Sequence, residues 1–106
     1  MVKESIITIV KKYLTELQKA GLQVSRAIIY GSNVRGEARE DSDIDLLLVS
    51  PIFDSDTDKY AGLIWRLTEV SDFKIEPIAV GEKRFAEDDV SVILEVARRE
   101  GIEIVI

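Results

Sequence analysis

Residues 31–49 read GSNVRGEAREDSDIDLLLV, and this stretch decides the fold. Its first twelve residues are mostly small, polar or charged and include two glycines. From Asp43 to Val49, two aspartates lead into four consecutive apolar residues, and Ser50-Pro51 ends the run. Such an apolar run is typical of a strand that is buried on both faces of a sheet. We therefore predict a polar turn that leads into an interior strand.

The sequence on either side alternates between helical and strand patterns. Apolar residues at helical spacing predict helices, and short β-branched or aromatic runs bounded by glycine predict strands. The expected elements are helices over 2–20, 54–70 and 86–99 and strands over 22–30, 43–49, 73–80 and 102–106. This order favours one α/β (α+β) domain, residues 1–106, in which helices pack against a small mixed sheet.

The connections between the strands predict where polar residues meet. The strands over 43–49 and 73–80 flank a helix, so we expect them to be parallel, with a right-handed crossover. Only about a dozen residues separate the strands over 22–30 and 43–49, so we expect that pair to be antiparallel. The carboxyl end of the first strand then lies beside the amino ends of the other two. The residues expected to converge at this edge are Gly31, Ser32, Asp43, Asp45 and Glu76.

The composition excludes several classes of chemistry. The chain has no cysteine and no histidine, which removes disulfide frameworks, thiol chemistry, serine–histidine–aspartate triads and nearly all zinc sites. Its net charge is −6, with 20 acidic and 14 basic residues, so long-range electrostatics disfavour a dedicated nucleic-acid-binding module. No apolar run has the length of a membrane span, and no basic-then-apolar leader is seen, so we expect a cytoplasmic protein.

Asp43 and Asp45 are two positions apart on a predicted strand, so their side chains point to the same face. Side by side, the carboxylates repel each other by roughly a few kcal/mol at an effective dielectric constant of ~20. Glu76 is expected at matched depth on the parallel neighbour, and three such carboxylates are typical of a site for Mg²⁺ or Mn²⁺. Two other interpretations stay open: a solvated strand entrance for the aspartates, and an ion pair of Glu76 with Lys74 or a helix residue.

Gly31 and Ser32 form a candidate phosphate-binding turn. Glycine at a strand end allows a positive φ and a close approach of the backbone, and Ser32 offers a hydroxyl and an N–H at the first turn of a short helix. Arg35 either reaches a phosphate or belongs to a solvated loop. A phosphate-binding turn beside a carboxylate-bound metal describes phosphoryl or nucleotidyl transfer, in which Glu76 helps to deprotonate or orient the attacking hydroxyl.

The aromatic side chains of Tyr30, Tyr60 and Trp65 lie at core-like positions. We expect them to belong to the core rather than to stack on a nucleobase. The first predicted helix has a wide apolar stripe, which either packs wholly in the core or also forms an interface with a partner. This stripe consists of Ile6, Ile7, Ile9 and Val10.

The spacing of the polar residues resembles a known signature. A Gly-Ser pair at 31–32, ten residues and an Asp-Ile-Asp triplet at 43–45 are similar to the motif of the DNA-polymerase-beta-like nucleotidyltransferases. The full run over 31–49 resembles the minimal single-domain members, the MNT proteins. The Ile-Glu-Pro-Ile run at 75–78, followed by a loop, a helix and a closing strand, also resembles that subgroup. The resemblance covers the chain from about residue 24 to its end.

The resemblance implies a role for each motif residue. Asp43 and Asp45 would be metal ligands, and Gly31 and Ser32 would hold the nucleotide phosphates. Glu76 takes the place of a third carboxylate, which is an aspartate in many relatives. The implied cofactor is Mg²⁺, with Mn²⁺ as the alternative, and the implied substrate is ATP or another nucleoside triphosphate.

Minimal proteins of this kind pair with an all-helical HEPN partner, often a ribonuclease toxin. The resemblance therefore implies an antitoxin that transfers AMP to a tyrosine of that partner, and a homo- or hetero-oligomer. Two alternatives stay open. One is a catalytically weak module that neutralises a helical partner by binding it, and the other is a nucleotidyltransferase that acts on a small molecule.

Overall fold

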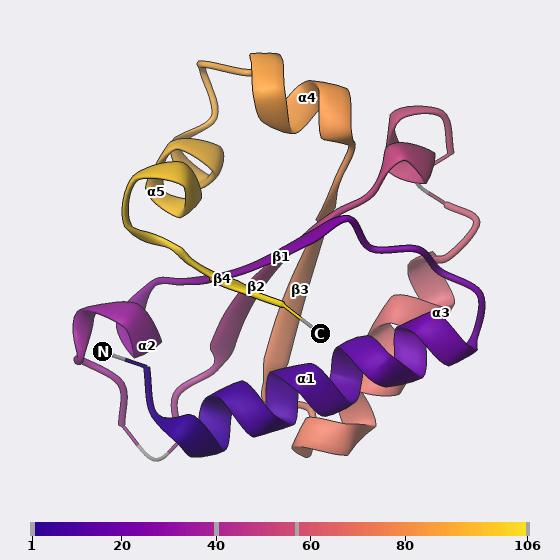
Figure 1. Cartoon of the computed structure of the whole chain (residues 1–106). Helices are drawn as coiled ribbons and strands as arrows, with labels where there is room; N and C mark the ends of the chain where they lie inside the picture. The colour runs from indigo at the N-terminus through magenta and orange to yellow at the C-terminus, as the bar shows by residue number, and fades with distance from the viewer. Residues whose placement is uncertain (1, 40, 57, 106) are drawn as a thin grey trace.

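Four strands form one sheet, and helices pack on both of its faces (Figure 1). The computed structural model describes residues 2–39, 41–56 and 58–105. The strands are β1 (Arg26–Tyr30), β2 (Ile44–Val49), β3 (Ile75–Val80) and β4 (Ile102–Ile104). The helices are α1 (Glu4–Lys19), α2 (Ser32–Arg35), α3 (Ala61–Arg66), α4 (Glu82–Glu87) and α5 (Val92–Glu100), with 3₁₀ segments η1 (Pro51–Asp54) and η2 (Leu67–Ser71). The mixed α/β fold expected from the sequence is confirmed.

The strand order is β3-β2-β1-β4, so β2 is an interior strand. It pairs with β1 in antiparallel and with β3 in parallel orientation, as the connection lengths predicted. Residues 46–49 are fully buried, because helices cover β2 on both faces. β1 also pairs in antiparallel orientation with the short edge strand β4. These directions bring the carboxyl end of β1 and the amino ends of β2 and β3 to one edge of the sheet.

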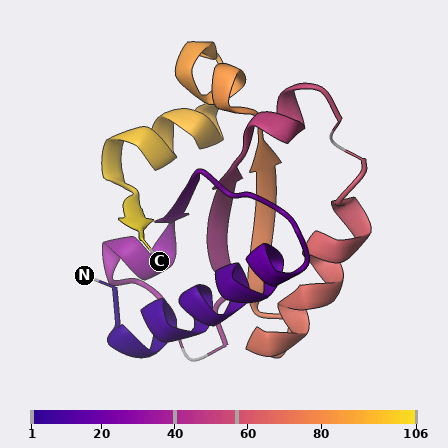
Figure 2. The ribbon, with the colours of Figure 1, turned by 45° about the vertical axis from the view of Figure 1, so that its right-hand side comes forward.

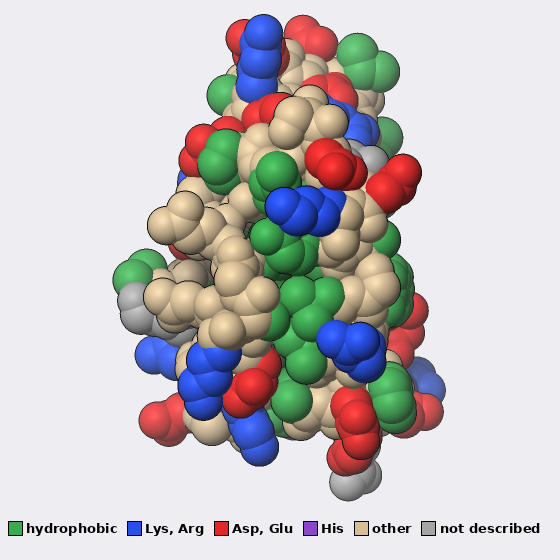
Figure 3. All heavy atoms as spheres, turned by 90° about the vertical axis from the view of Figure 1, so that its right-hand side faces the viewer, with side chains coloured by type: hydrophobic (Ala, Val, Ile, Leu, Met, Phe, Trp, Pro, Cys, Tyr) green, Lys and Arg blue, Asp and Glu red, His purple; other side chains and the backbone are tan. Residues whose placement is uncertain are grey.

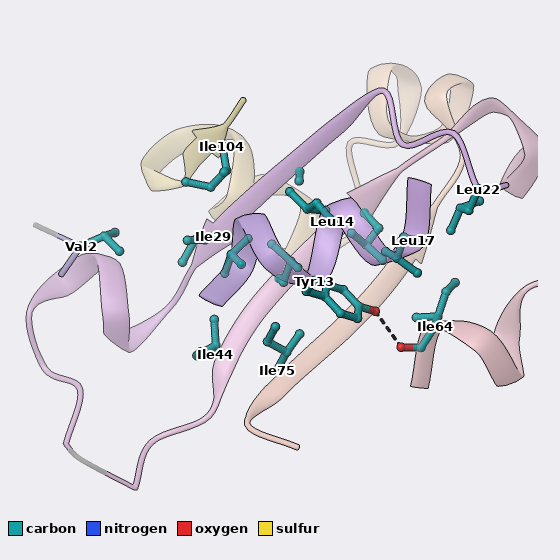
Figure 4. Close-up of a cluster of buried hydrophobic side chains, with 14 of the residues drawn as sticks. Val2, Tyr13, Leu14, Leu17, Leu22, Ile29, Ile44, Ile64, Ile75 and Ile104 are labelled. Carbon is teal, nitrogen blue, oxygen red and sulfur yellow. Dashed lines mark hydrogen bonds between the residues drawn. The ribbon is translucent and has the colours of Figure 1, made fainter. Parts of the chain in front are cut away.

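Two hydrophobic cores lie on the two faces of the sheet. The larger one lies between the sheet, α1 and the α3–η2 segment, and Figure 4 shows its side chains converging. Within it, the Tyr13 hydroxyl donates a hydrogen bond of 2.7 Å to the carbonyl of Ile64, which ties α1 to α3. The smaller core lies under α4 and α5, where Phe85 and Leu94 pack with Leu47 of β2.

The segment between β2 and β3 differs from the single helix expected over 54–70. It forms η1, α3 and η2 in succession. The Asp56 Oδ1 atom accepts hydrogen bonds from the N–H groups of Asp58 and Lys59. A side chain that bonds to nearby N–H groups in this way competes with helix formation, so the segment turns before α3 begins.

The single helix expected over 86–99 is also wrong, because two separate helices, α4 and α5, form in this part of the chain. Asp88 has an extended backbone with ψ 113°, and its Oδ1 atom accepts hydrogen bonds from the N–H groups of Val90 and Ser91. Ser91 then caps α5, where its Oγ atom accepts a hydrogen bond from the N–H of Leu94. The break therefore comes from local polar bonds that hydrophobic periodicity does not register.

The strand boundaries also differ from the expected ones. β1 and β3 begin later than expected, at Arg26 and Ile75. Just before β3, Asp72 and Phe73 have positive φ angles of 54° and 63°, so the backbone forms a turn there. The expected end of the last strand, residue 106, lies outside the described residues.

Trp65 has a relative exposure of 55%, so the expectation that it belongs to the core is wrong. Tyr30 is buried and Tyr60 is half-buried against the larger core, as expected. Figure 3 shows the face that carries α3, where hydrophobic side chains gather in a band between charged ones. In the α1 stripe, Val10 is fully buried and the three isoleucines pack half-buried against the core, which favours the core interpretation. None of the described helices has the length and apolar character needed to cross a membrane.

Candidate active site

Tyr30, Asp45 and Glu76 lie in one row across three neighbouring strands. Tyr30 is the register partner of Asp45 in the antiparallel pair, and Glu76 is its partner in the parallel pair. Alternation along the strands puts all three side chains, and that of Asp43, on the face that carries the smaller core. Glu76 is exposed, and α4 and α5 lie toward the opposite end of β3 (Figure 2). The polar residues therefore converge as predicted, at an open end of this face.

Gly31 follows β1 and lies against the side chain of Asp45. Its backbone has φ 80° and ψ −148°, a conformation that is essentially restricted to glycine. A Cβ atom at position 31 would overlap the Oδ2 atom of Asp45. Ser32 is the first residue of α2, so the predicted turn into a short helix is present.

Asn33 was not singled out by the sequence, and it connects the two halves of the motif. It is 8% exposed, and its Nδ2 atom donates a hydrogen bond of 3.0 Å to the backbone carbonyl of Asp43. The bond crosses the polar loop and holds α2 against the start of β2. Its sequence signal is weak, because asparagine in a polar loop is ordinarily a turn residue.

Asp45 and Glu76 bind protons more tightly than ordinary carboxylates. Burial, followed by the charge of Asp43, raises the pKa of Asp45, while Arg35 acts in the opposite direction. The charge of Asp43 is the main cause of the raised pKa of Glu76, followed by burial, a hydrogen bond with Asp43 and the charge of Asp45. An ion pair with Lys74 would shift the pKa of Glu76 downward. The electrostatics are therefore those of mutually repelling carboxylates.

Arg35 is bonded to two acidic side chains. Its Nε atom donates a hydrogen bond of 2.5 Å to Glu37, and its Nη1 atom donates one of 3.1 Å to Glu100. These bonds raise the pKa of Arg35. All three side chains are partly exposed, so solvent reaches both ion pairs. These bonds use two of the five N–H donors of the guanidinium, so donors remain for a phosphate contact at Arg35.

The oxygen atoms of Asp43, Asp45 and Glu76 are the type of donor that Mg²⁺ and Mn²⁺ prefer. The raised pKa values of Asp45 and Glu76 fit such a site, because a divalent cation would offset the repulsion among the three groups. Over residues 2–39, 41–56 and 58–105, no three acidic side chains already surround a single point as a metal-binding group. Mg²⁺ is usually held by one or two carboxylates together with water and substrate phosphates, so three converged carboxylates are not a condition for binding it.

Known proteins resemble this chain in sequence and in fold. A family model described as a nucleotidyltransferase domain matches residues 8–100. A crystal structure of a candidate nucleotidyltransferase from Sulfolobus solfataricus superposes with a TM-score of 0.56 at 21% identity, over 92% of this chain and 77% of that one. A crystal structure of a toxin–antitoxin with AMP-PNP superposes with a TM-score of 0.62 at 17% identity, over 93% of this chain and 72% of that one. At these identities the two structures show a shared fold. No curated protein sequence matches the chain.

Proposed function

The chain belongs to the nucleotidyltransferase domain family, and we propose that it transfers a nucleoside monophosphate, AMP from ATP, to a hydroxyl group of a partner protein. The observation that carries this proposal is the position of Asp45, which lies against Gly31 and beside Glu76. A phosphate-binding turn and a set of carboxylates at one edge are the two parts that nucleotidyl transfer requires.

The carboxylates of Asp43, Asp45 and Glu76 would hold Mg²⁺, or Mn²⁺ in its place. When bound, the ion supplies positive charge that stabilises the charge developing on the triphosphate. Asp45 is the central ligand, because it feels the charge of Asp43 and is the register partner of Glu76. A bound cation would relieve the repulsion among the three carboxylates, and this supports the assignment.

Gly31, Ser32 and Arg35 would bind the phosphates. Gly31 has no side chain to keep a phosphate away from the backbone, and Ser32 offers its N–H and hydroxyl at the start of α2. Arg35 would bind a phosphate oxygen through N–H donors that Glu37 and Glu100 do not use, or would exchange one of these carboxylates for it. Ion pairs that are exposed to solvent contribute little to stability, so such an exchange has a low cost.

In the reaction, the oxygen of the acceptor hydroxyl forms a bond to the α-phosphorus of ATP, and the bond from that phosphorus to pyrophosphate breaks. The hydroxyl proton passes to the carboxylate of Glu76. Glu76 is placed to accept it, because its side chain is exposed at the open end of the face. The products are the AMP-modified acceptor and pyrophosphate.

The proposed acceptor is a helical HEPN-type toxin, for which the chain would act as a cytoplasmic antitoxin by modifying a tyrosine hydroxyl. Two observations support a protein acceptor. One neighbour in fold is a toxin–antitoxin structure with AMP-PNP. In addition, the described chain places its carboxylates at an open end of the sheet face, where a side chain of a second protein can approach Glu76.

The test is a labelling assay with the purified chain, Mg²⁺, ATP labelled at the α-phosphate, and the protein encoded by the neighbouring gene or a lysate of the host. The wild-type chain should label one protein band. The double variant Asp43→Asn with Asp45→Asn should transfer no label while still binding the partner in a pull-down, because the substitutions conserve shape and remove charge. Label transfer by the double variant would falsify the assigned role of these aspartates.

A second candidate function is a binding module with little or no turnover. One observation favours it: Glu37 and Glu100 already occupy two of the N–H donors of Arg35. In that case the double aspartate variant would protect cells from the toxin as well as the wild type does, and no label would reach the partner.

A further inference from the structure

Two tyrosine side chains are buried among the described residues, and only one has a partner for its hydroxyl. Tyr13 is fully buried and donates its hydrogen bond to the carbonyl of Ile64 at 2.7 Å. Tyr30 is 8% exposed and its ring packs in the smaller core, but its hydroxyl forms no hydrogen bond with any described residue. Buried tyrosines usually bond their hydroxyl, so the difference requires an explanation.

The Tyr30 hydroxyl reaches the surface of the candidate site. No side-chain nitrogen or oxygen that is fully shielded from solvent lacks a hydrogen-bond partner in the described part of the chain. The unbonded Tyr30 hydroxyl is therefore not fully shielded, although its ring is buried. Asp45 is its register partner, and burial followed by the charges of Asp45 and Glu76 raises the pKa of Tyr30 to about 12. The hydroxyl is thus close enough to both carboxylates to feel their charge.

We propose that Tyr30 is a further nucleotide-binding residue, whose hydroxyl donates a hydrogen bond to an oxygen of the nucleotide's phosphate chain. This inference rests on the proposed function, because it places the phosphates beside Gly31 and Asp45. Asp45 is the neighbour that Gly31 and Tyr30 share. Its side chain contacts Gly31, and Tyr30 is its register partner on β1. Tyr30 and the Gly31 turn therefore adjoin the same carboxylate, and a phosphate at the turn would bring an anionic oxygen to the side of Asp45 on which Tyr30 lies.

The chemistry of the hydroxyl favours a phosphate oxygen as its acceptor. A phenol donates one hydrogen bond, and donation to an anionic oxygen gives a shorter and stronger bond than donation to a neutral one. A tyrosine hydroxyl is protonated at neutral pH, so Tyr30 acts as a hydrogen-bond donor. A donor that is already positioned but unbonded binds its ligand without first breaking an internal bond.

Tyr30→Phe tests this inference, because it removes only the hydroxyl oxygen. Affinities for ATP and for inorganic tripolyphosphate, each with Mg²⁺, are measured by isothermal titration calorimetry on the full chain. Tyr30→Phe should lower the affinity for both ligands about tenfold or more, which is the effect of losing a hydrogen bond to a charged group. Its melting temperature should not fall, because no internal hydrogen bond is lost.

Tyr13→Phe is the matched control. It should lower the melting temperature, because the bond to Ile64 is lost, and leave both affinities unchanged. Wild-type affinity of Tyr30→Phe for both ligands overturns the inference and leaves the proposed function standing. Weakened binding of ATP alone also overturns it, because the hydroxyl then contacts the base or the sugar. If the wild-type chain binds neither ligand, the inference and the proposed function both fail.

Discussion

The carboxylate of Asp45 occupies the space that any side chain at position 31 would need, directly over the backbone of Gly31. A single contact between neighbouring strands therefore fixes the position of the turn after β1 relative to the Asp45 carboxylate of β2. Because Gly31 also has φ 80° and ψ −148°, both the backbone conformation and the space around it require glycine.

Gly31→Ala is expected to abolish transfer and to lower the free energy of unfolding by about 1–3 kcal/mol, the cost of a strained backbone conformation. Chemical denaturation and the labelling assay measure the two effects. Gly36→Ala is the control, because Gly36 also has a positive φ of 76° but a Cβ there meets nothing within 4 Å. It should be less stable than wild type and keep its activity. Full activity of Gly31→Ala would contradict the assigned contact.

Asn33→Ala is expected to slow transfer about tenfold and to cost about 1 kcal/mol of stability, because Asp43 loses the bond that positions its backbone. Steady-state kinetics and thermal unfolding are the measurements. Ser55→Ala is the control, since it also removes a side-chain bond to a carbonyl, that of Ile52, away from the site. If both variants transfer at the wild-type rate, Asn33 does not position Asp43.

Asp45→Asn is expected to be more stable than wild type at neutral pH, with a difference that shrinks as the pH falls. The pKa of Asp45 is raised above its ordinary 3.8, so the folded chain binds this proton more tightly than the unfolded chain does. Protonation therefore stabilises the wild-type fold as the pH falls through the folded pKa toward 3.8. Urea unfolding of both proteins between neutral and acid pH measures the difference.

Asp88→Asn is the control, because the opposite change in stability is expected for it at neutral pH. Backbone hydrogen bonds from Ser91 and Val90, with a contribution from Arg84, lower the pKa of Asp88 below its ordinary 3.8. Its ionised form therefore stabilises the fold above pH 3.8, and that contribution is lost as the pH falls through the lowered pKa. Asp88→Asn should be less stable than wild type at neutral pH. Equal pH profiles for the two variants would contradict the assigned electrostatics.

Asp54→Ala is expected to lower stability by about 1 kcal/mol without changing the rate of transfer. The Asp54 carboxylate accepts hydrogen bonds from the N–H of Lys83 at 3.0 Å and of Arg84 at 3.4 Å, so it caps α4 from η1. Asp54→Asn keeps an acceptor oxygen and should retain most of the stability. Thermal unfolding compares the variants, and an unchanged melting temperature for Asp54→Ala would show that the cap contributes nothing.

The sheet and the convergence of the polar residues were predictable from the sequence. The apolar run ending at Val49 predicted the interior strand, and the connection lengths predicted its parallel and antiparallel neighbours, because chain reach limits the possible topologies. The depth of Glu76 relative to Asp45 followed from those directions. The catalytic roles of these residues remain predictions.

The parts that the sequence did not predict depend on individual polar bonds. Asp56 and Asp88 interrupt the two expected helices by bonding to nearby N–H groups, and hydrophobic periodicity contains no signal for such bonds. The same holds for Asn33, whose role comes from a partner that is distant in sequence. Trp65 was expected in the core, but it directly follows Ile64, the buried residue of α3, and the helical rotation between neighbouring residues turns it toward solvent.

Transfer of the nucleotidyl group itself is the central claim, and the position of the label on ATP tests it most directly. Two reactions contain the chain, Mg²⁺ and the partner protein, one with ATP labelled at the α-phosphate and the other with ATP labelled at the γ-phosphate. Nucleotidyl transfer to the partner places only the α-label on it and releases the γ-label in pyrophosphate. Label on the partner from the γ-phosphate, or from neither, would contradict the account.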